Sequence, residues 1–508
     1  MPTRQSDLTA ALCVGLCCGC LCAPIAWTQP TRPTTASTAP PSSPVASSTQ
    51  GTAWSFAGRG PGRVSAVDVS SEPGPPPLWA GWPTVTIDSM PDGTPIEFMT
   101  RTSPVVQGGD AFVLAWVDGY ETLVAVDLLA GSVRWAAELP PLVTDSWSSP
   151  AIDAQHHTVL VGVGDEVIAL GTRTGRVKWR TTLLGPVVNA SPIVTDDLGP
   201  RDRAFVTDYG YLSDAGRLYC LNTDPYDATL NPYQPGEIVW SVVIDSVSSG
   251  NSPAYANGTV YVATPGNGFS GGSVLAFDTE STSPPHSPPS PAWVFNNTNP
   301  TGFFGGVSVR RGAVFAATYG FGGGQLNSNI VKLSAQTGAL LWSAPSNRTS
   351  STPVPLADGR VVLSGGILPD PVFGDYGSRP SIAVYEAMGT LTLETALHTW
   401  TDADQDGSID PGEALLLGGW THQPVVIESA SGHAEAIVAV SPTTSLPGLG
   451  GVGLARLDLD WTPGSPTPLI SQASPLGGGS AAAPGGWLLS AGPSGLTIWR
   501  PRLVGGTP

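Results

Sequence analysis

Cysteine is scarce in this chain of 508 residues, and its placement excludes a disulfide framework. Five of the six cysteines lie near the N-terminus, at Cys13, Cys17, Cys18, Cys20 and Cys22. They fall inside an apolar run over residues 8–26 that follows Arg4 and ends in small residues, which is typical of an export signal rather than of a membrane span. Removal of this signal leaves Cys220 alone, too few for disulfide pairing within the chain.

Residues 1–26 are therefore expected to be an export signal, with two modes of export left open. Gly19 precedes Cys20, as in lipoprotein signals, but Cys17 and Cys18 stand where that motif normally carries Leu and a small residue. The alternatives are a lipid anchor and simple secretion. Residues 27–51 are rich in Pro, Ser and Thr and are expected to form a linker. Both alternatives predict an exported protein in the periplasm, at the outer membrane or outside the cell, without a transmembrane span after signal removal.

Charged side chains are also few, at 12%, and basic ones are the minority, since 22 Lys and Arg face 40 Asp and Glu for a net charge of -18. This acidic excess argues against nucleic acid or an anionic membrane surface as the main partner. Lysine occurs only at Lys178 and Lys332, a bias typical of a GC-rich bacterial genome. Glycine (62) and proline (51) are abundant instead, which suits many short strands and turns.

The segment 159–180, VLVGVGDEVIALGTRTGRVKWR, shows how these turns are used. It predicts strands at 159–163 and 167–170 and a third strand that ends near Trp179, because β-branched residues alternate between turn formers. Tight turns are expected at Gly164-Asp165 and at Thr174-Gly175. Three antiparallel strands joined by hairpins form one sheet.

The same pattern recurs along the chain about every 45 to 60 residues. Its outer strands are expected to carry Trp135, Trp179, Trp240, Trp293, Trp342, Trp400 and Trp461. Most copies begin with Ser-Pro or a close variant, at Ser103, Ser149, Ser191, Ser252 and Thr352, where a proline costs the first residue of an inner strand no ladder donor. Units of this size cannot bury their own apolar faces, so the copies must stack, and four-stranded sheets that stack radially form a β-propeller.

The number of copies predicts an all-β fold, a β-propeller over residues 52–502 followed by a tail at 503–508. Eight four-stranded blades are expected, with seven as the alternative. An eighth copy is split, because 487–490 and 496–499 supply inner strands near the C-terminus and no outer strand follows. Pro77-Leu-Trp79 is expected to supply that strand and to close the ring, which removes exposed sheet edges. A monomer is expected.

The repeated order of strand, Ala-Leu/Val-Asp, Thr/Ala-Gly and Trp resembles the repeat of the pyrroloquinoline-quinone (PQQ)-like eight-bladed propeller family. The resemblance implies that the turn glycines permit a positive φ and that the tryptophans pack between blades. That family contains both quinone-dependent dehydrogenases and non-enzymatic envelope lipoproteins that scaffold outer-membrane protein assembly. The fold therefore does not decide the function.

Residues 402–413, DADQDGSIDPGE, match the EF-hand calcium loop at its constrained positions. Gly407 occupies position 6, where the loop turns sharply. The predicted Ca²⁺ ligands are Asp402, Asp404, Asp406, the backbone carbonyl of Ser408, Asp410 through a water, and both carboxylate oxygens of Glu413. A hard cation needs this many oxygens, and neighbouring carboxylates repel one another without it.

The flanks of this loop are less complete than those of a sensor EF-hand. Leu393, Leu397 and Trp400 have helical spacing, but Trp400 also fits an outer strand. No second loop is present in the sequence, so a structural or extracellular type of site with an affinity of about 0.1–1 mM is predicted. The alternative is an acidic surface turn that only resembles the motif.

Candidate catalytic motifs are weak. Ser270 lies in a Gly-x-Ser-x-Gly motif but lacks the strand-to-helix context of a nucleophile elbow. The six histidines have no metal-ligand spacing, and His156-His157 is expected in a solvent-facing hairpin turn. Dehydrogenases of the resembling family use adjacent cysteines over the quinone and an Asp base. The chain after signal removal has only Cys220, so PQQ is not expected as a cofactor.

These observations predict an exported, non-catalytic propeller that presents its loops to a protein or a cell-envelope polymer, with one Ca²⁺ bound in an insertion. Long loops at 224–236, 281–291 and 319–329 are candidates for the binding surface. The main alternative is a PQQ-dependent quinoprotein oxidoreductase. A third hypothesis is a hydrolase or lyase that uses Ser270.

Overall fold

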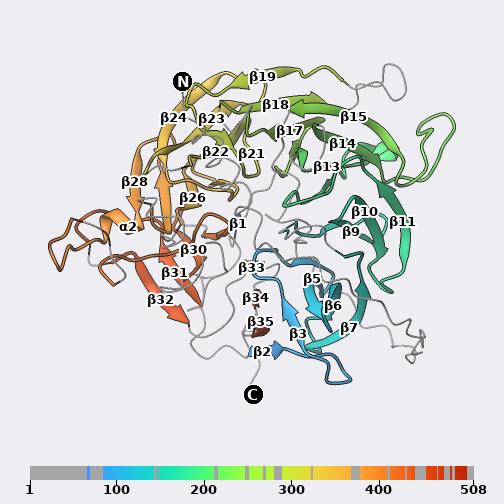
Figure 1. Ribbon diagram of the computed structural model, residues 1–508, viewed down its shortest axis with the longest axis horizontal. Helices are drawn as coiled ribbons and strands as arrows, with labels where there is room; N and C mark the ends of the chain where they lie inside the picture. The colour runs from blue at the N-terminus through green and yellow to red at the C-terminus, as the bar shows by residue number, and fades with distance from the viewer. Residues whose placement is uncertain are drawn as a thin grey trace, which may run out of the picture.

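The chain folds into a β-propeller of eight sheets around one axis, seen end-on in Figure 1. The computed structural model describes residues 66–68, 84–141, 146, 148–210, 215–245, 251–266, 271–279, 289–321, 324–367, 378–407, 409, 412–429, 432–440, 453–465, 467–473, 481–482, 487–492 and 494–499. The all-β, eight-bladed prediction is confirmed. The expected export signal, linker and C-terminal tail lie outside the described residues.

Each blade contains four antiparallel strands, and the strand named first for each blade lies beside the axis. Blade 1 has β4 (Val105–Gln107), β5 (Asp110–Val117), β6 (Tyr120–Asp127) and β7 (Ser132–Glu138), and β3 (Ile96–Phe98) also pairs with β5. Blade 2 has β8 (Ala151–Asp153), β9 (Thr158–Val163), β10 (Glu166–Gly171) and β11 (Val177–Thr182). Blade 3 has β12 (Ile193–Val194), β13 (Arg203–Thr207), β14 (Gly216–Asn222) and β15 (Ile238–Asp245). Blade 4 has β16 (Ala254–Ala256), β17 (Thr259–Ala263), β18 (Ser273–Asp278) and β19 (Trp293–Asn296).

The second half of the ring repeats this arrangement. Blade 5 has β21 (Ser308–Arg310), β22 (Ala313–Tyr319), β23 (Ser328–Ser334) and β24 (Leu340–Ser346), and β20 (Gly302–Phe303) also pairs with β22. Blade 6 has β25 (Val354–Pro355), β26 (Val361–Gly365), β27 (Ser381–Tyr385) and β28 (Leu391–Glu394). Blade 7 has β29 (Val425–Glu428), β30 (Ala434–Ala439), β31 (Leu454–Asp458) and β32 (Leu469–Ala473). Blade 8 has β33 (Ala481–Ala482), β34 (Leu488–Gly492), β35 (Gly495–Trp499) and β2 (Thr84–Ile87).

The ring is closed by an N-terminal outer strand, but a different one from that expected. β2 pairs antiparallel with β35, with Val85 opposite Ile498 and Ile87 opposite Leu496. The predicted segment, residues 77–79, lies outside the described residues. Strand β2 alternates β-branched residues, Thr-Val-Thr-Ile, and its Ile87 is buried in a core shared by blades 7, 8 and 1. Its own pattern therefore qualifies it as a strand.

Adjacent blades interlock through a tryptophan and a glycine. The turn glycine before the outer strand of one blade lies against the outer-strand tryptophan of the preceding blade, in the pairs Gly175 with Trp135, Gly236 with Trp179, Gly338 with Trp293 and Gly389 with Trp342. A Cβ on Gly175 would lie 2.6 Å from Trp135 Cε3, and Gly175 has φ +65°. The Trp135 indole also donates to Thr172 O at 2.9 Å. Tryptophan packing between blades is thus confirmed for these pairs.

Two of the seven tryptophans are not on outer strands. In blade 6 the outer strand β28 ends at Glu394, whose side chain accepts from Leu397 N and caps the short helix α2 (Thr395–His398), so Trp400 follows that helix in a loop. Trp461 lies in the turn between β31 and β32, where its indole donates to Ser465 O at 3.3 Å. The predicted outer-strand positions of Trp400 and Trp461 were therefore wrong. Both residues have the spacing of the outer-strand tryptophans, but Trp400 follows the capped helix α2 and Trp461 packs in a turn.

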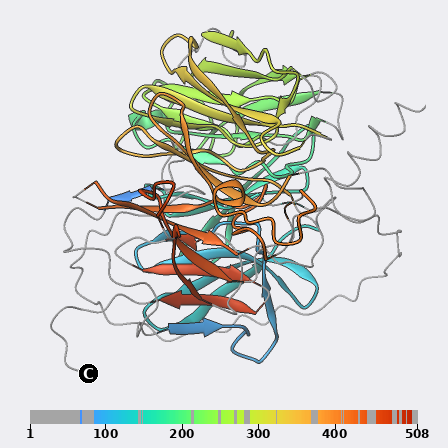
Figure 2. The same cartoon turned by 90° about the vertical axis from the view of Figure 1, so that its left-hand side faces the viewer.

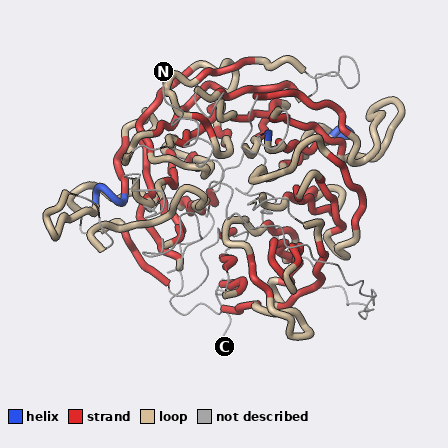
Figure 3. Tube along the Cα trace, in the orientation of Figure 1, coloured by secondary structure: helices blue, strands red, loops and turns tan. Residues whose placement is uncertain are grey.

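Helix is nearly absent, as the strand-dominated trace in Figure 3 shows. Among the described residues, no helix has both the length and the apolar composition that a bilayer crossing requires.

Because the strands of a blade alternate in direction, the connections between blades and those between second and third strands share one end of the propeller. We call this end the pocket face. In the side view of Figure 2 the strands of the blades lie one above another.

We expect Gly175→Ala to lower the free energy of unfolding by about 2–6 kcal/mol. The substitution places a side chain in the left-handed region and against the Trp135 ring, and each effect costs about 1–3 kcal/mol. Gly258→Ala is the matched control, since Gly258 has φ +77° and an added Cβ would meet no atom within 4 Å. Urea unfolding measures both, and an equal loss in the two variants would contradict the interlock.

We expect Ile87→Ala to destabilise the ring by about 2–5 kcal/mol, because it removes a buried side chain from the closing strand. Thr84→Ala, on the exposed start of the same strand, should change stability by no more than about 0.5 kcal/mol. Thermal unfolding of both variants checks this. If Ile87→Ala melts with the wild type, β2 does not close the ring.

Candidate functional site

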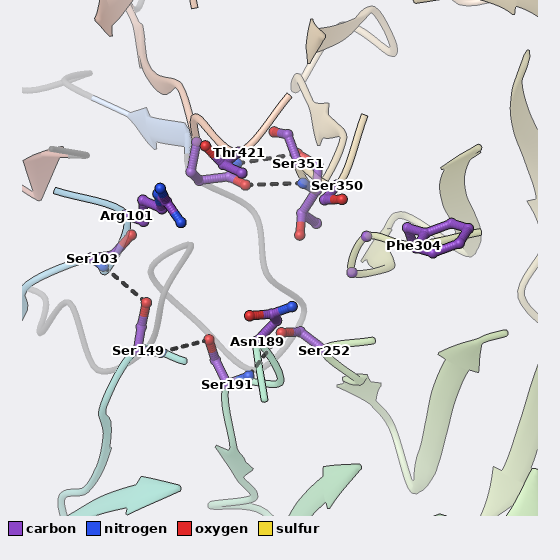
Figure 4. Close-up of a pocket in the computed structure, with 14 residues that line it drawn as sticks. Arg101, Ser103, Ser149, Asn189, Ser191, Ser252, Phe304, Ser350, Ser351 and Thr421 are labelled. Carbon is purple, nitrogen blue, oxygen red and sulfur yellow. Dashed lines mark hydrogen bonds between the residues drawn. The ribbon is translucent and has the colours of Figure 1, made fainter. Parts of the chain in front are cut away.

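A ring of small polar residues surrounds the axis at the pocket face. Each member precedes the innermost strand of its blade, and the blades are joined there by hydrogen bonds from one member to the next. Ser103 N donates to Ser149 Oγ, Ser149 N to Ser191 Oγ, and Ser191 N to Ser252 Oγ, each at 2.9 Å (Figure 4). Because the hydroxyl oxygens of Ser149, Ser191 and Ser252 accept from a neighbouring blade, these hydrogen bonds fix the positions of the three side chains.

On the opposite side of this ring, a side-chain amide replaces the serine hydroxyl. Gln423 Oε1 accepts from Thr352 N and Gln423 Nε2 donates to Thr352 O, both at 3.1 Å. Gln423 therefore pairs with the backbone of blade 6 as another peptide group would. The residues before it are also held in place, since Ser350 N donates to Trp420 O at 2.7 Å and His422 Nε2 accepts from Ala439 N. Burial lowers the pKa of His422 to about 4, which keeps this acceptor neutral.

The ring encloses a small axial pocket with a volume of about 50 Å³. Fourteen residues line it, and Figure 4 shows them converging from blades around the axis. Arg101 is the one charged side chain among these described residues, and most of the others are Ser or Thr. A space of this size holds a few water molecules or the tip of one side chain, since a single water needs about 10–15 Å³. The pocket is polar and rigid rather than a deep apolar cleft.

An aromatic cluster adjoins the pocket on the side of blade 5. Tyr319 lies 5.5 Å from Phe304, 4.9 Å from Phe321 and 5.5 Å from Trp420, measured between ring centroids. Phe304 also lines the pocket, and Phe321 lies in the predicted long loop 319–329. Phe304 and Phe321 are partly exposed, whereas Tyr319 and Trp420 are buried. Polar and aromatic surfaces thus meet beside the axis, as at many binding sites.

The predicted calcium loop projects from the connection between β28 and β29, on the pocket face. Carboxylate oxygens of Asp402, Asp404 and Glu413 lie within 4.8 Å of one another. Gly407 has φ +79°, as the sharp turn at position 6 requires, and its N–H donates to Asp402 Oδ2 at 3.2 Å. The other oxygen, Asp402 Oδ1, is buried and has no hydrogen-bond partner within the described residues.

The remaining predicted ligands are not all part of this group. Asp406 is exposed, and its N–H donates to Asp404 Oδ1 at 3.2 Å, but its carboxylate is not in the cluster. Ser408 and Asp410 lie outside the described residues. The loop end is ordered by Glu413, which accepts from Ala403 N at 2.6 Å. The acidic residues that come together are therefore Asp402, Asp404 and Glu413.

The base of the loop is attached to blades 5 and 6 through buried polar groups. Arg379 Nε donates to Ile409 O at 2.7 Å, and Arg379 N donates to Gln325 Oε1 at 2.9 Å. Gln325 in turn donates to the carboxylate of Glu394 at 2.8 Å. Burial raises the pKa of Glu394, while its hydrogen bonds oppose that shift. The acidic loop and the loop 319–329 thus share one hydrogen-bonded base.

The other long loops lie at the opposite end of the propeller. Residues 224–236 join β14 to β15 and are held by Asn231, which donates to Asn222 Oδ1 at 3.0 Å. His156 contacts this loop, since its ring lies 3.1 Å from Asp224 and 2.8 Å from Asp153. The turn position of both histidines was correct. His157 is exposed as expected, whereas His156 is only partly exposed because its ring contacts these two carboxylates. Most of the 281–291 loop lies outside the described residues.

Sequence motifs for catalysis gain no support from these positions. Ser270 lies outside the described residues, and the strand after it, β18, belongs to a hairpin. Cys220 is fully buried in β14, and burial raises the pKa of its thiol. The axial ring was missed as a site in the sequence, although its signal was present. The repeated Ser-Pro pairs were interpreted only as strand starts.

Comparison with known proteins supports the repeat family over part of the chain. Residues 119–224 match the PQQ_2 family model, described as "Outer membrane protein assembly factor BamB". No curated protein sequence matches the chain.

Solved structures with the same fold include BamB and two dehydrogenases. BamB from Moraxella catarrhalis is 14% identical, with a TM-score of 0.50 over 83% of this chain and 98% of that one. The quinohemoprotein alcohol dehydrogenase from Comamonas testosteroni is 12% identical, with a TM-score of 0.52 over 88% and 80%. A europium-containing methanol dehydrogenase is 11% identical, with a TM-score of 0.52 over 87% and 90%. At these identities the chain shares the propeller fold with all three, and the PQQ-like repeat is its recognisable sequence feature.

Proposed function

We propose that this protein is an exported, non-catalytic scaffold that binds another protein through its pocket face. The observation that carries the proposal is the convergence of a polar axial pocket, a partly exposed aromatic cluster and the inserted acidic loop on one end of the propeller. Aromatic anchors beside fixed polar groups are what a protein interface uses for affinity and orientation. A cell-envelope polymer is the alternative occupant.

The partial match to an outer-membrane assembly factor supports a protein partner and a location in the cell envelope. The acidic chain argues in the same direction, because it disfavours nucleic acid and anionic lipid surfaces. The export signal, whether it leads to a lipid anchor or to secretion, remains part of this proposal. A monomeric ring is sufficient for it, since β2 supplies the outer strand of the last blade.

A quinoprotein oxidoreductase is the less favoured function. The similar dehydrogenase structures share only the fold with this chain. Among the described residues that line the axial pocket there is no cysteine and no carboxylate, so these residues do not supply a vicinal cysteine pair or a catalytic base. PQQ binding therefore lacks a fitting set of side chains within the described pocket.

We also propose that the loop 402–413 binds one Ca²⁺. Asp402, Asp404 and Glu413 would be its carboxylate ligands, with Asp406, Ser408 and Asp410 completing the oxygen set that the motif specifies. Support comes from the clustered carboxylates, the positive φ of Gly407 and the buried oxygen of Asp402, which has no hydrogen-bond partner within the described residues. Calcium would stiffen this insertion at the pocket face.

Site-specific photo-cross-linking tests which face binds the partner. With p-benzoyl-phenylalanine at Phe321 on the pocket face, we expect a protein adduct in cells that express the full chain. The matched control places it at Tyr226, which is 52% exposed in the loop at the opposite end and should give none. Mass spectrometry of the adducts identifies the partner. Adducts from position 226 alone would contradict the proposal, and polysaccharide adducts at 321 would favour the polymer alternative.

We expect Ca²⁺ to raise the thermal midpoint of the protein, and chelator to reverse the effect. At 100-fold over Kd, the ion would stabilise the fold by about 2.7 kcal/mol. The double variant Asp404→Ala, Glu413→Ala should not respond. A control with Glu97→Ala and Asp165→Ala, two exposed acidic residues elsewhere, should respond as the wild type does. No response in the wild type would identify the loop as an acidic turn.

A further inference from the structure

Blade 7 differs from the other blades at its axial edge. Strand β1 (Ala66–Asp68) pairs in parallel with β29, with Ala66 opposite Val426, Val67 opposite Ile427 and Asp68 opposite Glu428. Each described blade has one innermost strand, and of these eight strands β29 is the one that pairs with a strand on both of its edges. Figure 1 places β1 near the centre of the ring, beside blade 7. A segment from the N-terminal part of the chain therefore lies on the axis side of this blade.

Strand β29 is suited to accept another strand. It has four residues, whereas the innermost strands of the other seven blades have two or three. Its axial edge carries backbone N–H and C=O groups that require partners, so an extended chain can add to it regardless of side-chain identity. Recognition by strand addition of this kind is a common mode of peptide binding.

Both ends of β29 are anchored to neighbouring blades, which hold the edge in place. Before the strand, Gln423 makes its two hydrogen bonds to the backbone of Thr352 in blade 6. At its end, the carboxylate of Glu428 accepts from Ala357 N and from Arg310 Nη1 of blade 5, the latter at 2.9 Å. Residues 425 and 426 between these anchors are buried. An edge that is already ordered avoids part of the entropic cost of binding.

β1 is not needed to close the ring, because β2 completes blade 8. It is also only three residues long, so its pairing with β29 contributes few hydrogen bonds. The edge lies next to the axial pocket, since Gln423 lines that pocket and lies two positions before the first residue of β29. A short, supernumerary strand on a rigid edge beside a pocket has the arrangement of an exchangeable ligand.

We propose that the axial edge of β29 is a docking site for an extended peptide segment of the partner protein, and that β1 occupies it in the free protein. The inference deepens the proposed scaffold function and rests on it for the identity of the natural occupant. Binding of the partner segment displaces β1 from this edge. The segment is extended, pairs in parallel with β29 and lacks proline at adjacent pairing positions.

The test uses the full chain with Ala66→Pro and Val67→Pro. Every second N–H group of a strand points to the same neighbouring strand. One of two adjacent prolines therefore removes an N–H that points to β29, whichever of the two residues that is. The probe is a fluorescein-labelled peptide of residues 62–72, measured by anisotropy. We expect it to bind the variant at least about tenfold more tightly than the wild type, because β1 lowers the fraction of protein with a free edge.

Matched controls separate pairing from other effects. Ala66→Val with Val67→Ile keeps both N–H groups and should bind the peptide as weakly as the wild type, and a peptide with proline at both positions should not bind the variant. Hydrogen exchange should show protection of residues 425–428 by the bound peptide. Failure to bind, equal binding to both proteins, or binding without this protection would overturn the proposal.

Two further readouts keep the result interpretable. Because β2 closes the ring, the proline variant should melt close to the wild type. If it does not fold, excess peptide added to the wild type should remove hydrogen-exchange protection from residues 66–68 while residues 425–428 stay protected, and unchanged protection at 66–68 would overturn the proposal. A cross-link at Phe321 without peptide binding would leave the scaffold function standing and exclude this docking edge.

Discussion

The contact between a tryptophan of one blade and a turn glycine of the next is the constraint on which the propeller depends. The indole of Trp135 lies where any side chain on Gly175 would be, and the same geometry recurs at Trp179, Trp293 and Trp342. Each contact sets the distance and angle between neighbouring blades, since close-packed groups have few alternative arrangements. The contact occurs at four of the interfaces between blades, in both halves of the ring.

The polar ring at the axis follows from that arrangement. When the blades are fixed, the residues that precede the inner strands are brought within hydrogen-bond distance of one another, and Ser103, Ser149, Ser191 and Ser252 form a continuous series. Blade 7 departs from it, because Gln423 spans the gap to Thr352 with both ends of its amide. Gln423 lies two positions before β29, so blade 7 connects the axial pocket to the edge of β29 that pairs with β1.

The sequence predicted the parts of this structure that depend on local pattern. The strands and turns around residues 159–180, the eight blades and the packing role of most tryptophans were correct because alternation and turn residues determine them. Trp400 and Trp461 were assigned wrongly because spacing alone cannot detect a capping carboxylate such as Glu394. Strand β2 was missed because an alternating pattern of only four residues is too short to distinguish a strand from a loop. The Ser-Pro pairs predicted strand starts, but only the closed ring brings their hydroxyl groups together.

Residues that maintain the fold must be distinguished from residues that are proposed to bind a partner. The Gly–Trp contacts maintain the propeller fold, which this chain shares with BamB and with the dehydrogenases, so these contacts carry no information about a partner. The features that carry the proposals lie outside the repeated blade strands: the loop 402–413, the aromatic residues around Tyr319, and β1 on the edge of β29. All three belong to blades 5 to 7 or to the connections between them. That side of the propeller is therefore where a partner can be recognised without disturbing the closure of the ring at blade 8.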